Sequence, residues 1–202
     1  AYRRPLVFST TVRAYGDLLM QHRFRGFAIT SSVSMAGLYA FIAVSPFVFI
    51  EHFQVSPPQF GWISGGNAFW LILASQFNGR LVRRFKPLPL LKASLLVQVS
   101  AGVMLLAVGW TGVGGLWLLL PPLFLYTGCL GFILPNATIL AMEPYKAHAG
   151  TASALYGTIG SISGAIAAST VSVLQGQDAK ILCTVMAICT TLACVRSRFL
   201  RD

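Results

Sequence analysis

Side chains able to carry acid–base or nucleophilic chemistry are scarce in this chain, and they avoid its apolar parts. The five acids lie at the edges of long uncharged tracts or outside them: Asp17, Glu51, Glu143, Asp178 and Asp202. The three histidines lie at similar boundaries: His22, His52 and His148. A serine protease working within such tracts needs a histidine beside its serine, and an aspartyl protease needs paired carboxylates. We therefore expect no catalytic residues and no enzymatic activity.

Metal and cofactor chemistry finds little support in the sequence. The four cysteines fall inside uncharged tracts, with no Cys-x-x-Cys pair and no neighbouring histidine: Cys129, Cys183, Cys189 and Cys194. Such cysteines are more often small apolar packing residues than metal ligands or disulfide partners. No glycine-rich phosphate loop stands beside a strand, and no strand is evident. We expect no metal and no organic cofactor.

Polar and aromatic side chains within the uncharged tracts are candidates for contact with a bound molecule. The candidates for lining a substrate cavity are Tyr39, Phe41, Asn67, Tyr126, Asn136 and Tyr156. Ordinary packing would use the same aromatic residues, and an amide in an apolar setting needs partners. Asn136 follows Pro135, which cannot donate to the carbonyl of Gly131, so its amide either bonds near that carbonyl or faces a wet cavity. The sequence leaves both alternatives open.

The elements that would position these residues are the uncharged tracts themselves. Apolar residues make up 55% of the chain and charged residues only 10%, whereas a soluble domain has about 25% charge. About 20 apolar residues in a helix cross the roughly 30 Å hydrocarbon core of a bilayer. Six such spans are predicted, with a turn at residues 110–115: 26–50, 60–79, 93–110, 116–142, 150–174 and 180–196. The predicted fold class is an all-α membrane protein with six transmembrane helices.

The distribution of positive charge predicts how these spans are oriented. With six spans, all but one of the 15 Lys and Arg residues fall in segments on one side of the membrane, and the exception is Lys180. Positive residues are retained in the cytoplasm, so both termini are expected there. Residues 1–25 would form a cytoplasmic linker and residues 26–202 a transmembrane domain. The net charge of +10 is then a sign of topology, and nothing in the sequence points to nucleic-acid binding.

Small residues recur at every fourth position of residues 149–169, AGTASALYGTIGSISGAIAAS. They form two ladders, one containing Gly157 and Ser161 and the other containing Gly160 and Gly164. Helices in lipid associate through close backbone approach, which Gly, Ala and Ser permit. Both ladders are therefore expected to face protein. The contact is either static packing within the bundle or a smooth surface along which two groups of helices rock.

Arginines gather in the predicted cytoplasmic loop after the second span. Arg80, Arg83 and Arg84 belong to this loop. One interpretation is that they anchor the topology by the positive-inside rule. The other is that their guanidinium groups bond carbonyls at neighbouring helix ends and hold one conformation closed at the cytoplasmic side.

Three segments carry a family resemblance. They are SPFVFIEHFQVSPPQFGWISGGNAF, NGRLVRRF and LPNATILAMEPYKAHAGTASALYG, in which AGTASAL is the most specific part. In this order they resemble the Bcr/CflA drug-resistance transporters of the major facilitator superfamily, from the seventh span to the start of the eleventh. The chain is thus similar to the C-terminal six-helix half of such a transporter.

The resemblance implies half of a twelve-helix, proton-coupled multidrug efflux antiporter of the bacterial inner membrane. Its partners would be the missing N-terminal half, the lipid bilayer and small amphipathic drugs, and residues 1–25 would lie in its central loop. The coupling ion would be the proton, carried by a residue of the other half. Such halves contain a three-plus-three inverted repeat, although the first three spans do not align by eye with the last three. The alternative is a stand-alone six-helix channel or scaffold that dimerises through its small-residue faces.

Overall fold

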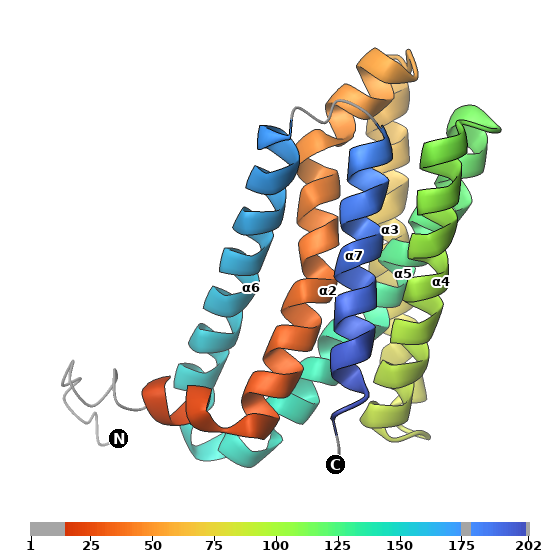
Figure 1. The fold of residues 1–202 in the computed structure, drawn as a ribbon. Helices are drawn as coiled ribbons and strands as arrows, with labels where there is room; N and C mark the ends of the chain where they lie inside the picture. Colours follow the sequence, from red (N-terminus) through yellow and green to blue (C-terminus); the bar gives the residue numbers. More distant parts are fainter. Residues whose placement is uncertain (1–14, 175–178, 201–202) are drawn as a thin grey trace.

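The chain folds into an upright bundle of helices. The computed structural model describes residues 15–174 and 179–200, which contain six long helices and no strand (Figure 1). Two short segments, the π-helical η1 and the 3₁₀-helical η2, extend them. The elements are α2 (His22–Pro46), η1 (Phe47–His52), α3 (Pro57–Leu81), α4 (Pro87–Thr111), α5 (Gly115–Met142), η2 (Glu143–His148), α6 (Ala149–Val173) and α7 (Ala179–Ser197). The predicted all-α class is confirmed, and each expected span corresponds to one helix.

Membrane-spanning character is not equally strong in the six helices. Among the described residues, five are long and apolar enough to cross a membrane: α2 with η1, α4, α5 with η2, α6 and α7. The remaining helix, α3, has 25 residues, which is as long as α4. Polar residues such as Ser64, Asn67 and Gln76 lower its hydropathy. The second predicted span is therefore a helix of sufficient length that composition alone does not mark as membrane-spanning.

Local sequence signals set the helix ends. At the start of α3, Ser56 and Gln59 form a capping box and Pro57 occupies the first helical position, where its missing N–H is not needed. Between α4 and α5 the chain turns through Gly112 and Gly114, which adopt left-handed φ angles of 66° and 74°. Glycine reaches this region without steric penalty. The turn predicted at residues 110–115 is confirmed.

The helices pack as two interlocked groups of three. In the first group α2 packs against α6 and α7, and in the second group α5 packs against α3 and α4. Two further contacts, α2 with α5 and α4 with α7, join the groups. If the first three helices are exchanged with the last three, the contacts of one group become those of the other, and each of the two joining contacts is unchanged. The packing thus has the pattern of a three-plus-three repeat, which the sequence does not reveal.

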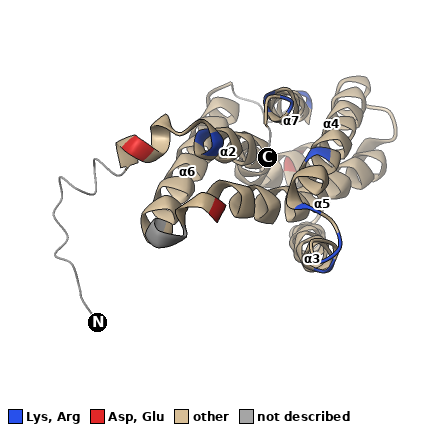
Figure 2. Ribbon diagram, turned by 90° about the horizontal axis from the view of Figure 1, so that it is seen from below, with Lys and Arg blue, Asp and Glu red and all other residues tan. Residues whose placement is uncertain are grey.

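Positive charge gathers at one end of the bundle. The described chain starts and ends there, at the bottom of the bundle in Figure 1. Figure 2, viewed from that end, shows Lys and Arg residues on α2, α3, α4 and α7. Arg83 follows α3 and Arg198 follows α7 at this end, whereas Lys180 begins α7 at the other end. The alternation of charge predicted for six spans agrees with this arrangement.

Candidate functional site

Two hollows flank α2, and none of the described residues that line them is charged. The α2–α3 hollow has a volume of about 480 Å³, and the α2–α6 hollow about 230 Å³. The α2–α3 hollow is lined by Leu38, Phe41, Ile42, Ser45, Pro46, Phe60, Ser64, Asn67, Ala68, Leu71, Ile72 and Thr127. The α2–α6 hollow is lined by Ser31, Ser32, Met35, Tyr39, Leu134, Tyr156, Gly157, Gly160 and Ser161. Four of the six candidate cavity residues line one hollow or the other: Tyr39, Phe41, Asn67 and Tyr156.

The α2–α3 hollow is largely apolar with one polar corner. Thr127 of α5 donates from Oγ1 to Asn67 Oδ1 of α3 at 2.5 Å, and the same hydroxyl lies 3.1 Å from the Leu123 carbonyl. Phe41 is almost fully buried and packs edge-on against Phe49, with ring centroids 6.1 Å apart. Such a surface suits an apolar or aromatic group that places one hydrogen-bonding atom near Asn67.

The α2–α6 hollow is bounded by two tyrosines. The hydroxyl of Tyr156 donates to Ser31 Oγ at 2.6 Å, and Ser31 Oγ in turn donates to the Phe27 carbonyl at 3.0 Å. At the other edge, the Tyr39 ring lies so close to Gly164 that a Cβ on residue 164 would overlap it. These two contacts fix α6 against α2 and leave the hollow between them.

Tyr126 lies in a buried polar cluster and lines neither hollow. Its hydroxyl donates to the Ser34 carbonyl at 3.3 Å, and it is fully buried. Ser34 Oγ donates to Gln98 Oε1 at 2.5 Å, and Gln98 Nε2 donates weakly to the Tyr126 carbonyl at 3.5 Å. This cluster joins α2, α4 and α5 at mid-height. Ser34 and Gln98 were not predicted from the sequence, although a glutamine in the uncharged 93–110 span is a signal that could have identified one of them.

Asn136 also lies in the interior, paired with Asn78 of α3. Its Nδ2 donates to Asn78 Oδ1 at 2.7 Å and to the Phe132 carbonyl at 2.8 Å. The Phe132 carbonyl is next to the Gly131 carbonyl, to which Pro135 cannot donate. The Asn136 amide therefore bonds the backbone near that carbonyl, which is the first of the two alternatives given for it. The partner Asn78, one of two asparagines in α3, was not singled out from the sequence. Contact of Tyr126 or Asn136 with a substrate stays a prediction.

The two small-residue ladders of α6 have different surroundings. Gly164 is buried and Gly160 half-buried against α2, whereas Gly157 and Ser161 are exposed. A Cβ on Gly157 would meet no atom within 4 Å. Within the described chain, one ladder therefore faces α2 and the other faces outward at the edge of the α2–α6 hollow.

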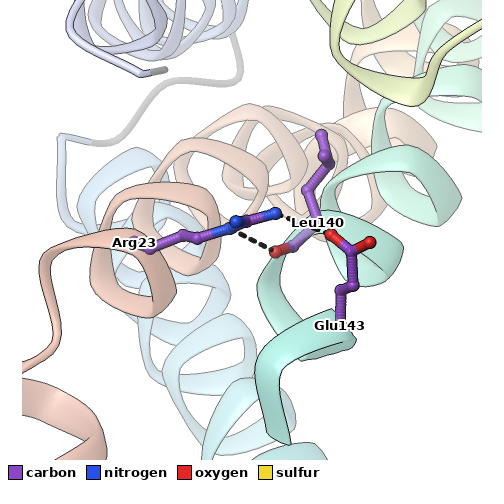
Figure 3. A network of polar contacts seen from close by, with 3 residues as sticks. All are labelled: Arg23, Leu140 and Glu143. Carbon is purple, nitrogen blue, oxygen red and sulfur yellow. Dashed lines mark hydrogen bonds and ion pairs between the residues drawn. The ribbon is translucent and has the colours of Figure 1, made fainter. Parts of the chain in front are cut away.

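Arg23, and not an arginine of the loop after α3, bonds a carbonyl at the end of a neighbouring helix. Figure 3 shows Arg23 Nη2 paired with Glu143 Oε2 at 2.7 Å, while Nε donates to the Leu140 carbonyl at 3.4 Å. In a continuing α-helix the N–H of residue 144 would bond this carbonyl, and Pro144 has none. The side chains of Arg80, Arg83 and Arg84 are exposed and form no hydrogen bond or ion pair with other described residues.

A bundle of long apolar helices is the architecture of a helical membrane protein. Comparison with known families narrows the class. The family model described as Major Facilitator Superfamily matches residues 3–168. The chain belongs to this family of membrane transporters, and it is a multi-pass membrane protein.

Curated relatives agree with the family. The chain is 30% identical over 171 residues, 85% of its length, to an uncharacterized MFS-type transporter, YdgK, of Bacillus subtilis, of which the match covers 42%. It is 28% identical over 98% of its length to 50% of a bicyclomycin resistance protein homolog of Haemophilus influenzae. It is also 38% identical over 46% of its length to 23% of multidrug resistance protein D of Escherichia coli. The chain spans about half the length, or less, of these relatives.

Proposed function

We propose that this chain is the C-terminal half of a Bcr/CflA-type antiporter that exports small amphipathic drugs across the bacterial inner membrane by alternating access. The observation that carries the proposal is the pair of uncharged hollows beside α2, in a chain similar to two relatives named for drug resistance. Apolar and aromatic lining with few polar anchors suits a broad range of substrates.

The outward-facing ladder of α6 is the proposed contact with the N-terminal half. Gly157 and Ser161 are exposed, and on α3 the large apolar side chains of Trp62 and Phe69 are exposed at 83% and 61%. Either lipid or protein could cover the large apolar side chains of α3. The small residues of α6, by contrast, favour close contact with another helix. A smooth α6 face would let the two halves rock while the hollows beside α2 hold the substrate.

Proton coupling is assigned to the other half of the transporter. No carboxylate or histidine lines either hollow, so the described residues offer no group there that binds and releases a proton near neutral pH. The positively charged end of the bundle would face the cytoplasm, with both ends of this chain. No organic cofactor is required for such exchange.

The test is drug accumulation in cells that express the full-length protein. Cells are loaded with the cation ethidium or with uncharged chloramphenicol, and retention is followed after glucose is added, with and without a protonophore. We expect several-fold lower retention than in cells with empty vector, and loss of the difference with the protonophore. If retention of both compounds equals that in cells with empty vector, export is contradicted. If export persists with the protonophore, proton coupling is contradicted.

The second candidate is a stand-alone membrane protein that dimerises through the exposed α6 ladder. The same outward-facing Gly157 and Ser161 would support it. The coding sequence upstream of Ala1 separates the two: six further apolar spans in frame favour the transporter half. A start codon beside Ala1, together with a dimer in detergent, would favour the stand-alone protein.

A further inference from the structure

The α2–α6 hollow differs in chemistry from the α2–α3 hollow. Hydroxyl groups make up more than half of its lining side chains: Ser31, Ser32, Tyr39, Tyr156 and Ser161. Among the residues that the structure describes, no charged one lines it. Its volume of about 230 Å³ equals that of roughly eight water molecules at ~30 Å³ each. The space thus fits part of a small molecule and offers hydrogen bonds without charge.

One of these hydroxyls is buried and has no partner. Ser32 is 3% exposed, and its Oγ forms no hydrogen bond with the described residues. A buried polar group without a partner is unfavourable, and more so at membrane depth, where water is scarce. The neighbouring Ser31, by contrast, is satisfied by Tyr156 and by its own helix. The Ser32 hydroxyl is therefore still able to form a hydrogen bond with a bound molecule.

The facing helix places a glycine opposite this buried hydroxyl. A Cβ on Gly160 of α6 would lie 3.7 Å from Ser32 Oγ, an ordinary contact distance, so the glycine leaves room over the hydroxyl. Across the hollow, Tyr156 donates its proton to Ser31 and retains lone pairs that can accept. The hollow therefore presents both a donor and acceptors.

We infer that the α2–α6 hollow binds the uncharged, oxygen-bearing part of the exported molecule, a carbonyl or hydroxyl group that pairs with Ser32. The inference rests on the proposed export function and specifies its substrate class. An uncharged ligand satisfies Ser32 without bringing a charge into the apolar interior. A cation finds no carboxylate among the lining residues, and burial of an unpaired charge is strongly unfavourable.

The experiment measures concentration-dependent export by the full-length protein of two probes. Chloramphenicol is uncharged and carries hydroxyl and carbonyl groups, and tetraphenylphosphonium is a cation without hydrogen-bonding groups. Ser32→Ala removes the hydroxyl, and Gly160→Ala covers it with a methyl group at a tolerated distance. The matched control is Thr30→Val, which removes another buried, unpartnered hydroxyl of α2 that does not line the hollow.

We expect Ser32→Ala and Gly160→Ala to raise the half-maximal concentration for chloramphenicol about fivefold, the effect of one uncharged hydrogen bond. Any export of tetraphenylphosphonium should be the same in these two variants as in wild type, because this cation cannot bond Ser32. Thr30→Val should stay near wild type for both probes. Equal losses for both probes, or an equal loss in Thr30→Val, would overturn the inference. Export of tetraphenylphosphonium but not of chloramphenicol by the wild type would also overturn the inference, although the proposed transport function would remain. Export of neither probe would overturn the function and the inference together.

Discussion

Close packing of α6 on α2 depends on the absence of a side chain at Gly164. A Cβ at this position would overlap the Tyr39 ring, with further ring atoms at 2.7 and 2.8 Å. Carbon atoms in contact normally lie about 3.5–4.0 Å apart. In Gly164→Ala, either the ring must move or the two helices must separate. The variant therefore tests whether this contact fixes the relation between α2 and α6.

The expected magnitude combines two opposing effects. Overpacking by one methyl group costs about 1–3 kcal/mol, whereas alanine in place of glycine inside a helix gains about 1 kcal/mol. Gly164→Ala should thus lower the free energy of unfolding by about 0–2 kcal/mol. In a Tyr39→Ala background the overlap is gone, so Gly164→Ala should stabilise by about 1 kcal/mol. The effect of Gly164→Ala on the free energy of unfolding should therefore differ by about 1–3 kcal/mol between the two backgrounds, and this difference measures the cost of the overlap.

The assay is thermal unfolding of the purified full-length protein and the three variants in one detergent. A change of 1 kcal/mol shifts the midpoint by roughly 2–4 °C in a domain of this size. We expect a lower midpoint for Gly164→Ala than for wild type or an unchanged one, and a higher midpoint for the double variant than for Tyr39→Ala. The same shift in both backgrounds would refute the reasoning, because the ring would then not be what the new methyl group meets.

Two other contacts give further predictions. Arg23→Gln should lower the free energy of unfolding by at most about 1 kcal/mol, because both charged groups of the Arg23–Glu143 pair are partly exposed; a larger loss in thermal unfolding would show that the Leu140 carbonyl depends on this guanidinium. Asn136→Leu should cost about 1–3 kcal/mol, since Asn78 Oδ1 loses its donor in a buried site. The double variant with Asn78→Leu should recover most of that loss, and equal destabilisation of the single and double variants would contradict the pairing.

The sequence was sufficient to predict the helices because their signals are local. Uncharged tracts of about 20 residues, the glycines between α4 and α5, and the positions of the arginines each need only a short window of sequence. The boundaries moved by a few residues: the span expected at 26–50 is α2 from His22, continued by η1 to His52. The wider turns of η1 follow Pro46, where the helix cannot make its regular hydrogen bond.

Side-chain partners could not be predicted, because they depend on contacts between distant segments. Tyr126 and Asn136 were chosen as polar groups in apolar tracts, but many such groups serve to join helices. Gln98 lies 64 residues from its partner Ser34, and Asn136 lies 58 residues from Asn78. Only the folded bundle, which brings α2 beside α4 and α3 beside α5, reveals that these amides have partners in its interior.

The contacts between helices explain why the three-plus-three packing pattern is not visible in the sequence. In the α2–α6 pair the small residue, Gly164, lies on α6 and the large one, Tyr39, lies on α2. In the corresponding α5–α3 pair the sizes are reversed: Gly128 of α5 faces Trp70 of α3, and a Cβ on Gly131 of α5 would come within 2.8 Å of the α3 backbone. Close approach requires one small and one large partner, but not a particular helix to supply either. Equivalent helices can therefore keep the same packing while their sequences lose the pattern that an alignment would detect.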